Sequence, residues 1–214
     1  MLDAIIFDGE GIVVDTETIW DRGQQEFLRR RGLVYDRDRI KPLITGRSVV
    51  EGVRIMQREY GFSGDPEPLA RERIEIVKGL FEREVKFIDG FEAFYRRVRD
   101  QYKTCIATAM AEDLLAVVDR RLALSRLFDG HIFSLADVGY RSKPNPDIFL
   151  YAASQLNCRP ADCVVIEDAP HGIEAARRAG MRCIALTTTY RREKLEAADL
   201  VVGSYPEIDL AVFG

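Results

Sequence analysis

Short apolar segments alternate with amphipathic segments along most of this chain. Each apolar segment has the length of a buried strand, and turn-forming or acidic residues follow most of them. They predict strands at 4–7, 104–107, 131–134, 163–166, 182–186 and 200–202. Apolar residues at helical spacing between them predict helices at 91–99, 112–122, 147–156 and 172–179. This alternation predicts an α/β fold, a doubly wound parallel sheet with helices on both faces.

The segment from residue 15 to residue 86 differs, because it shows helical signals and no convincing strand. Helices are expected from about 16 to 31, 49 to 60 and 66 to 80. Their predicted caps are Asp15 or Thr16, Ser48 with Glu51, and Asp65 with Pro66. We therefore predict a Rossmann-like core of residues 1–14 and 87–214, with a helical domain of residues 15–86 inserted into it.

Composition and charge argue against some functional classes, such as nucleic-acid-binding and membrane proteins. The chain has 214 residues, 47% of them hydrophobic, which is enough for one full domain and a smaller insertion. A net charge of −4, with basic residues scattered among acids, argues against a nucleic-acid partner. No apolar run reaches the ~20 residues of a membrane span, and Asp3 and Asp8 lie where a signal peptide would be basic or apolar.

The expected compartment is the cytoplasm. The four cysteines agree with this, because they form no zinc pattern and most lie on or beside predicted buried strands, as reduced core thiols do. The sequence does not determine the oligomeric state, and a monomer is the default expectation.

Two predicted strands end in carboxylates. The first runs into Asp8, with Glu10 two residues later, and the fourth runs into Glu167 and Asp168. An α/β sheet binds its ligands beyond the carboxyl ends of its strands, so these side chains are expected to share one crevice. Magnesium prefers oxygen ligands and usually takes one or two carboxylates. The pattern therefore predicts a Mg²⁺ site.

Four motifs, in this order, resemble those of the haloacid dehalogenase superfamily. They are Asp8-x-Glu10-Gly11 followed by Asp15-Thr16-Glu17, then Thr108 after a strand, then Lys143-Pro144-Asn145-Pro146, and last Glu167-Asp168-Ala169-Pro170 with the helix that follows. The chain looks most like the β-phosphoglucomutase and phosphoglycolate phosphatase branch, in which a helical cap is inserted into a Rossmann-like core.

The resemblance implies a phosphatase that hydrolyses a small phosphorylated metabolite. Asp8 would attack phosphorus to form an aspartyl phosphate. The implied Mg²⁺ ligands are Asp8, Asp168 and the Glu10 carbonyl, with Glu167 beside them. Lys143 would balance the charge of Asp8 and the phosphate.

Weaker assignments concern residues around the phosphate. Thr108, Ala109 and nearby backbone amides would hold a phosphate oxygen, although a threonine there also suits a local turn. Arg47, in Thr45-Gly46-Arg47-Ser48 of the insertion, would hold a second anionic group, and a plain surface arginine fits equally well. His171 beside Asp168 is expected to be structural or exposed.

Glu10 departs from the family pattern, because phosphatases and phosphomutases of this superfamily normally have aspartate two residues after the nucleophile. That carboxyl group serves as the general acid and base, which contributes ~10²- to 10⁴-fold, and the extra methylene of glutamate displaces it. A slow enzyme is one reading. A degenerate member that binds Mg²⁺ and a phosphometabolite without turnover is another.

A sugar phosphomutase is the remaining alternative. In that branch the cap supplies a histidine a few residues after the Asp15-Thr16-Glu17 motif, and this chain has Trp20 there. Hydrolysis is therefore preferred.

The helical insertion is expected to move as a lid hinged near residues 13–17 and 85–90, because phosphoryl transfer to an aspartate must exclude stray water.

Overall fold

The computed structural model describes residues 2–44 and 47–213, which divide into two compact units. The core unit contains the described residues up to Asp15 and from Lys86 onward, and the helical unit contains those between Thr16 and Val85. The core unit holds a sheet of six parallel strands in the order β3-β2-β1-β4-β5-β6. The strands are β1 (Ala4–Phe7), β2 (Lys103–Ala107), β3 (Ile132–Phe133), β4 (Cys163–Glu167), β5 (Arg182–Leu186) and β6 (Leu200–Val202). This confirms the predicted α/β fold with a parallel sheet.

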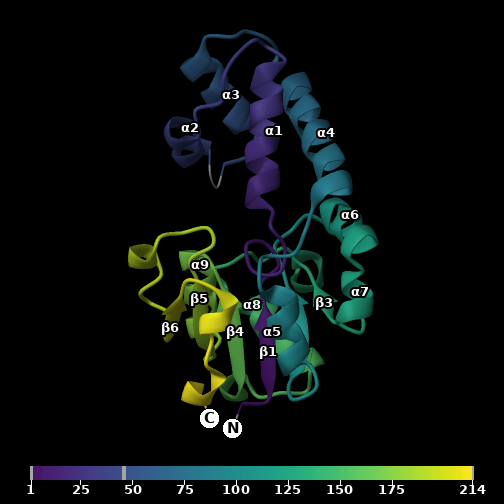
Figure 1. Ribbon diagram of the computed structural model, residues 1–214, viewed down its shortest axis with the longest axis vertical. Helices are drawn as coiled ribbons and strands as arrows, with labels where there is room; N and C mark the ends of the chain where they lie inside the picture. Colours follow the sequence, from purple (N-terminus) through teal and green to yellow (C-terminus); the bar gives the residue numbers. More distant parts are fainter. Residues whose placement is uncertain (1, 45–46, 214) are drawn as a thin grey trace. The chain divides into compact units, whose positions relative to one another are not determined.

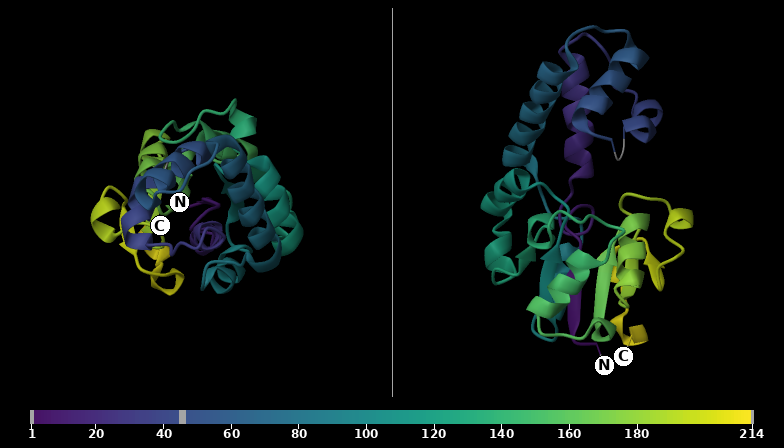
Figure 2. Two further views of the ribbon diagram at one scale, coloured as in Figure 1. Left: turned by 90° about the horizontal axis from the view of Figure 1, so that it is seen from above. Right: turned by 180° about the vertical axis from the view of Figure 1, so that it is seen from behind.

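Helices cover both faces of the sheet. Figure 1 shows α5 (Phe91–Val98) in front of the strands, and the reverse view in Figure 2 shows α8 (Asp147–Gln155) and α9 (Pro170–Arg178) on the opposite face. The remaining elements of the core unit after β2 include α6 (Glu112–Leu122), α7 (Leu124–Leu127) and five short 3-10 helices, at Leu135–Val138, Pro160–Asp162, Arg192–Lys194, Tyr205–Glu207 and Leu210–Phe213.

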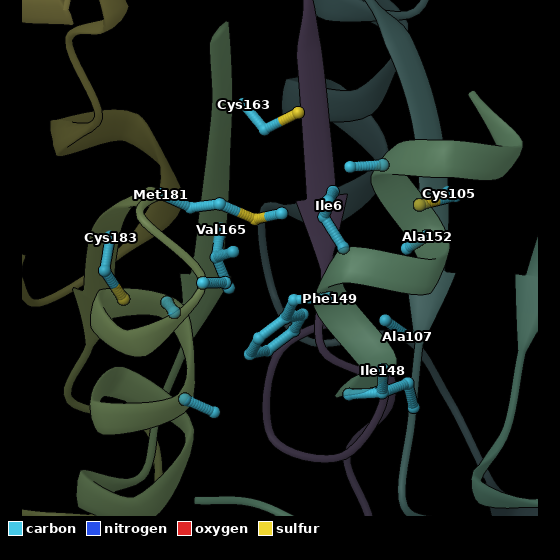
Figure 3. Close-up of a cluster of buried hydrophobic side chains, with 14 of the residues drawn as sticks. Ile6, Cys105, Ala107, Ile148, Phe149, Ala152, Cys163, Val165, Met181 and Cys183 are labelled. Carbon is cyan, nitrogen blue, oxygen red and sulfur yellow. The ribbon is translucent and has the colours of Figure 1, made fainter. Parts of the chain in front are cut away.

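Alternate residues of β1 contribute to two different packing layers. Ile6 belongs to the cluster beneath α8 and α9, together with Phe149, Val165 and Met181 (Figure 3). Phe7, on the other face, contacts an aromatic group of Phe91, Phe94, Tyr95 and Phe128. Every residue of β1 is fully buried, as expected for a central parallel strand with helices on both sides. The free thiols of Cys105, Cys163 and Cys183 are buried, which confirms the expectation of core thiols.

The helical unit consists of α1 (Glu17–Arg29), α2 (Arg37–Ile44), α3 (Val49–Tyr60) and α4 (Pro66–Glu84). Helix α1 packs along α4, and α3 packs against both α2 and α4. The Ser48 hydroxyl accepts from the Glu51 amide at 3.2 Å, and the Asp65 carboxylate accepts from the Glu67 amide at 3.1 Å. The caps predicted at the starts of α3 and α4 are therefore confirmed.

Three local features differ from the sequence prediction. At the start of α1, Thr16 lies at the N-cap position, but its side chain makes no capping hydrogen bond. Helix α2 was not predicted as a separate element, because Pro42 lies inside it and interrupts the helical pattern. The predicted strand 131–134 is shorter, since Ser134 leaves the sheet and caps the 3-10 helix that follows. Within the described residues, no helix is both long and apolar enough to cross a membrane.

Candidate active site

Strands β1 and β4 are neighbours, and their register places Asp8 next to Glu167. Phe7 pairs with Ile166, and the Asp8 amide donates to the Ile166 carbonyl at 2.9 Å. Strand β1 is also the point where the order of connection reverses, with β2 on one side and β4 on the other. Parallel α/β sheets bind ligands at such a switch point. The two carboxylate-bearing strand ends thus lie together, as the sequence predicted.

A tight loop follows Asp8. The Gly9 carbonyl accepts from the Val13 and Val14 amides at 3.1 and 2.9 Å, and the Gly11 amide donates to the Val14 carbonyl at 2.9 Å. Gly11 has φ of 74°, and a Cβ there would overlap the Asp168 carboxylate, so this position requires glycine. The loop brings the chain close to Asp168 without a side chain between them.

A buried ion cluster lies at these strand ends. The Lys143 ammonium donates to Asp8 Oδ1 and, at 2.7 Å, to Glu167 Oε1. The other oxygen of Glu167 accepts from the amides of Asp168 and Ala169 at 2.8 and 2.9 Å. Each member of the cluster, Asp168 included, is at most 8% exposed. Glu167 therefore orients Lys143 and the start of α9, with both of its oxygens engaged by protein donors.

Burial and neighbouring charges shift the pKa values of these carboxyl groups in different directions. Burial raises the pKa of Asp8 to about 7, with Lys143 opposing and Glu167 adding to the shift. Burial, with the charges of Glu167 and Asp8, also raises the pKa of Asp168. For Glu167 burial would raise the pKa, but Lys143 and the two amides outweigh it and lower it. Two carboxyl groups are thus poorly compensated by the one ammonium.

The same residues fit a divalent cation. Carboxylate oxygens of Asp8, Glu167 and Asp168 lie within 4.8 Å of one another. They are hard oxygen donors, the type that Mg²⁺ prefers. A cation here would oppose the burial and the charge repulsion that together raise the pKa of Asp8 and Asp168. Because Glu167 is engaged elsewhere, Asp8 and Asp168 are the better ligand candidates.

Thr108 and Ala109 follow β2 at the same edge of the sheet. Thr108 is fully buried, and its hydroxyl accepts from the Met110 amide at 3.0 Å, which is the local turn that the sequence also allowed. A Cβ at Gly9 would overlap the Thr108 side chain, so the loop after β1 and the turn after β2 are in contact. Ala109 is exposed. Thr108 therefore lies beside the loop that carries Glu10, which is itself partly buried.

Arg47 lies in the helical unit, where its guanidinium pairs with Glu51 at 3.0 Å and both side chains are about half exposed, at 56% and 45%. Thr45 and Gly46 of the same predicted loop lie outside the described residues. His171 is exposed at the start of α9, as expected. The structure therefore groups Asp8, Lys143, Glu167 and Asp168 in the core unit and places Arg47 in the other.

Several supporting residues were missed by the sequence analysis. The buried Tyr205 hydroxyl donates to the Ile12 carbonyl at 2.8 Å and fixes the loop after β1. Thr189 hydrogen-bonds the Asp168 carboxylate. A Cβ at Gly172 would overlap the Glu167 carboxylate, so glycine leaves the space for that side chain. Only the last had a usable signal, a glycine in the first turn of a helix.

Known proteins resemble this chain in sequence and in fold. The profile of the haloacid dehalogenase-like hydrolases matches residues 2–180. Fructose-1-phosphate phosphatase YqaB of Escherichia coli (strain K12) is 34% identical over 189 residues, covering 84% of this chain and 94% of that protein.

Two solved structures extend the comparison. A haloacid dehalogenase family hydrolase from Deinococcus radiodurans R1, with bound phosphate and sodium, has a TM-score of 0.85 at 27% identity, covering 99% of this chain and 95% of its own. The β-phosphoglucomutase of Clostridium difficile has a TM-score of 0.69 at 26% identity, covering 99% and 95%. The chain belongs to the haloacid dehalogenase-like hydrolases, in the phosphatase and β-phosphoglucomutase-like branch.

Proposed function

We propose that this enzyme hydrolyses a small phosphate monoester, in a Mg²⁺-dependent reaction that passes through an aspartyl phosphate on Asp8. The observation that carries the proposal is the buried Asp8 carboxylate, held by Lys143 and lying beside Asp168 at the switch point of the sheet. A buried carboxylate with a fixed cationic partner is suited to nucleophilic attack on phosphorus. The phosphatase relatives support phosphorylated sugars as the substrate class.

In the first half of the proposed reaction, an oxygen of Asp8 attacks phosphorus and the bond from phosphorus to the substrate oxygen breaks. The leaving oxygen takes a proton from the Glu10 carboxyl group, so the alcohol departs neutral. Lys143 donates to Asp8, which fixes the orientation of the nucleophile and opposes the rise in its pKa that burial causes.

In the second half, water attacks the phosphorus of the aspartyl phosphate. Glu10 takes a proton from this water, the bond between phosphorus and the Asp8 oxygen breaks, and inorganic phosphate leaves. Thr108 and the amides beside it are proposed to hold a phosphate oxygen. Each half returns the proton that the other uses, so Glu10 ends the cycle as it began.

The proposed metal ligands are Asp8, Asp168 and the backbone carbonyl of Glu10, and Mg²⁺ held there would neutralise charge on the phosphate oxygens. Glu167 positions Lys143 and the loop before α9 through its three hydrogen bonds, with the Lys143 ammonium and with the amides of Asp168 and Ala169. It is proposed as a positioning residue and not as a ligand.

Hydrolysis is favoured over phosphomutase activity by Trp20. This residue stands where the mutase branch has a histidine, and in the helical unit its ring lies 5.7 Å from the Arg73 guanidinium. An indole has no group that takes up or releases a proton near neutral pH, so Trp20 cannot replace the histidine as an acid or base.

We further propose that the helical unit acts as a lid and that the enzyme works in the cytoplasm.

The test is a screen of phosphorylated sugars with the wild type and Asp8→Asn, each with and without Mg²⁺. We expect phosphate release from the wild type with Mg²⁺ only, and none from Asp8→Asn. Asp100→Asn is the matched control, because it makes the same chemical change at a side chain that is 85% exposed. Borohydride reduction of the working enzyme should convert residue 8 to homoserine. Parental turnover by Asp8→Asn would overturn the mechanism.

A further inference from the structure

The loop that carries Glu10 is held at its start, its end and its middle. Its start continues directly from β1. Its end pairs with the chain that returns from the helical unit, because the Ile88 amide donates to the Val13 carbonyl at 3.0 Å. Its middle is held at Ile12, whose carbonyl accepts from the Tyr205 hydroxyl at 2.8 Å. This middle contact comes from a residue 193 positions away in the chain.

The Ile12 carbonyl depends on that hydroxyl. Ile12 is fully buried, and the hydrogen bonds that close the loop on itself are accepted by the Gly9 and Val14 carbonyls instead. Within residues 2–44 and 47–213, no second donor reaches the Ile12 carbonyl. A buried carbonyl without a donor is unfavourable, so losing the Tyr205 hydroxyl favours a different position of this peptide group.

Tyr205 is itself fixed in place. It is 1% exposed, and its ring centroid lies 5.1 Å from that of Phe94 and 5.8 Å from that of Phe91. The turn around it is closed by a hydrogen bond of 2.7 Å from the Ser204 hydroxyl to the Glu207 carboxylate. Burial raises the pKa of Tyr205 well above its ordinary value, so the hydroxyl keeps its proton as a donor. Tyr205 therefore offers the loop a rigid donor.

The position of Glu10 follows from that of Ile12. The two residues are separated only by Gly11, in a loop that is closed by its own hydrogen bonds. A displacement of the Ile12 peptide group therefore moves Glu10 as well. Proton transfer depends steeply on geometry, and a misplacement of ~1 Å can cost ~10²-fold in rate.

We propose that Tyr205 is a positioning residue for proton transfer. Through the Ile12 carbonyl, its hydroxyl holds the loop in the conformation in which the Glu10 carboxyl group reaches the leaving oxygen and the attacking water. This inference rests on the proposed function for the role of Glu10. Tyr205 lies outside the four sequence motifs and beyond residue 180, where the match to the family profile ends.

Three variants separate this role from simple packing. Tyr205→Phe removes the hydroxyl and keeps the ring. Tyr95→Phe is the matched control, because Tyr95 packs against the same Phe91 at 5.5 Å but its hydroxyl donates to the Leu127 carbonyl at 2.7 Å, away from the loop. Each should lower Tm by about 2 to 4 °C, the effect of one lost hydrogen bond. Tyr205→4-aminophenylalanine is the rescue variant, since its amino group can still donate.

Amide hydrogen exchange, resolved by residue, tests the loop without any catalysis. In Tyr205→Phe, the Val13 and Val14 amides should exchange at least ~10-fold faster than in Tyr95→Phe, because their hydrogen bonds close the loop. The Asp8 amide, which is bonded to β4, should exchange equally in both variants. The rescue variant should return to the wild-type rates.

Kinetics then test the link to Glu10. For a phosphorylated sugar that the wild type hydrolyses, kcat should fall ~10- to 100-fold in Tyr205→Phe, with KM changed by less than ~2-fold. Tyr95→Phe should keep the wild-type kcat, and the rescue variant should regain most of it. On a Glu10→Ala background, Tyr205→Phe should cost less than a further ~2-fold, because its effect passes through the Glu10 carboxyl group.

The inference is wrong if loop exchange is unchanged in Tyr205→Phe. It is also wrong if the Asp8 amide accelerates as much as Val13 and Val14, or if kcat falls equally with and without the Glu10 carboxyl group, since either result marks a purely structural tyrosine. The proposed function fails separately, if the wild type releases no phosphate from any phosphorylated sugar. The exchange comparison then still decides whether Tyr205 holds the loop.

Discussion

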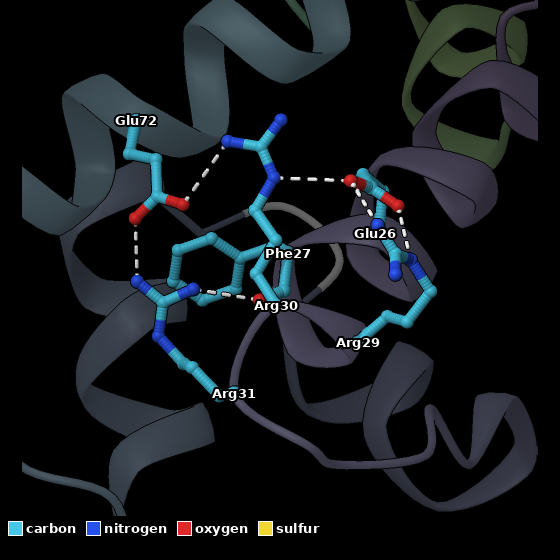
Figure 4. A network of polar contacts seen from close by, with 6 residues as sticks. All are labelled: Glu26, Phe27, Arg29, Arg30, Arg31 and Glu72. Carbon is cyan, nitrogen blue, oxygen red and sulfur yellow. Dashed lines mark hydrogen bonds and ion pairs between the residues drawn. The ribbon is translucent and has the colours of Figure 1, made fainter.

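Two networks of opposite charges, one in each unit, show how burial changes what such a network can do. In the helical unit, Glu26 pairs with Arg29 and Arg30, and Glu72 pairs with Arg30 and Arg31 (Figure 4). In the core unit, Lys143 pairs with Asp8 and Glu167. The distances are similar, but the side chain of Arg29 is 70% exposed and that of Lys143 is 3% exposed.

The two networks differ because water can solvate the exposed charges but not the buried ones. Hydrogen bonds from Arg29 and Arg30 lower the pKa of Glu26 to about 2, and water solvates whichever partner is released. Around Asp8 no such solvation exists, and burial raises its pKa to about 7 although an ammonium contacts it. An exposed network therefore tolerates the loss of a member, whereas a buried one loses charge balance.

Lys143→Met should have the largest effect. It leaves Asp8 and Glu167 buried without a cation, which typically costs about 3 to 5 kcal/mol, and it removes a donor of the kind worth ~10²- to 10³-fold in rate. We expect turnover to fall by at least ~10³-fold and the denaturant midpoint to fall clearly. Lys194→Met, at an exposed lysine of the core unit, serves as control. A Lys143→Met enzyme with half the wild-type rate would contradict the proposed role.

Magnesium should stabilise the buried network by an amount that depends on pH. The pKa of Asp8 is about 7 in the folded protein and ordinarily 3.8, so the folded state retains a proton that the unfolded chain releases. Stability from this proton is present at low pH and is lost as pH rises from about 4 through 7. Mg²⁺ replaces the proton, and at 100 times its Kd it contributes about 2.7 kcal/mol.

Thermal melting with Mg²⁺ or with EDTA measures this effect. The rise in Tm on adding Mg²⁺ should be larger at pH 8 than at pH 5 and should disappear in Asp168→Asn. A shift that is equal at both pH values, or that survives in Asp168→Asn, would place the metal elsewhere.

Glu10→Asp should change the rate by ~10-fold, about 1.4 kcal/mol of activation free energy. If the extra methylene displaces the acid, the shorter side chain raises turnover, because it restores the proton-transfer geometry. Mg²⁺ binding should change little, since the proposed ligand is the backbone carbonyl. Steady-state kinetics of the parent, Glu10→Asp and Glu10→Ala decide this. Equal rates for all three would show that position 10 transfers no proton.

Glu26→Gln should have the smallest effect. Exposed ion pairs contribute little, so we expect Tm to change by less than about 2 °C and turnover to remain unchanged. Any change should shrink further in high salt, because salt screens exposed charges. A loss of stability comparable to that of Lys143→Met would contradict the contrast drawn between the two networks.

The amino-acid sequence by itself determined the fold class and the positions of the strand-end carboxylates. Strands such as 4–7 and 163–166 are uninterrupted apolar runs, and their ends are marked by Asp8 and by Glu167 with Asp168. Parallel strands place their carboxyl ends at one edge of a sheet, so local pattern was enough to bring these residues together. The caps of α3 and α4 were equally local, because each depends on residues two or three positions apart.

Only the tertiary structure decided which charged and polar side chains contact one another. The family resemblance implied that Lys143 faces Asp8, but not that Lys143 also contacts Glu167. The hydrogen bond from Tyr205 to Ile12 and the burial of Arg73 beside Gln24 were not expected either, and they too join segments far apart in the chain. Sequence spacing carries no information about such contacts, since they depend on how helices and loops pack. Burial is likewise a property of the packed chain, and it is burial that raises the pKa of Asp8 and lowers the pKa of Arg73.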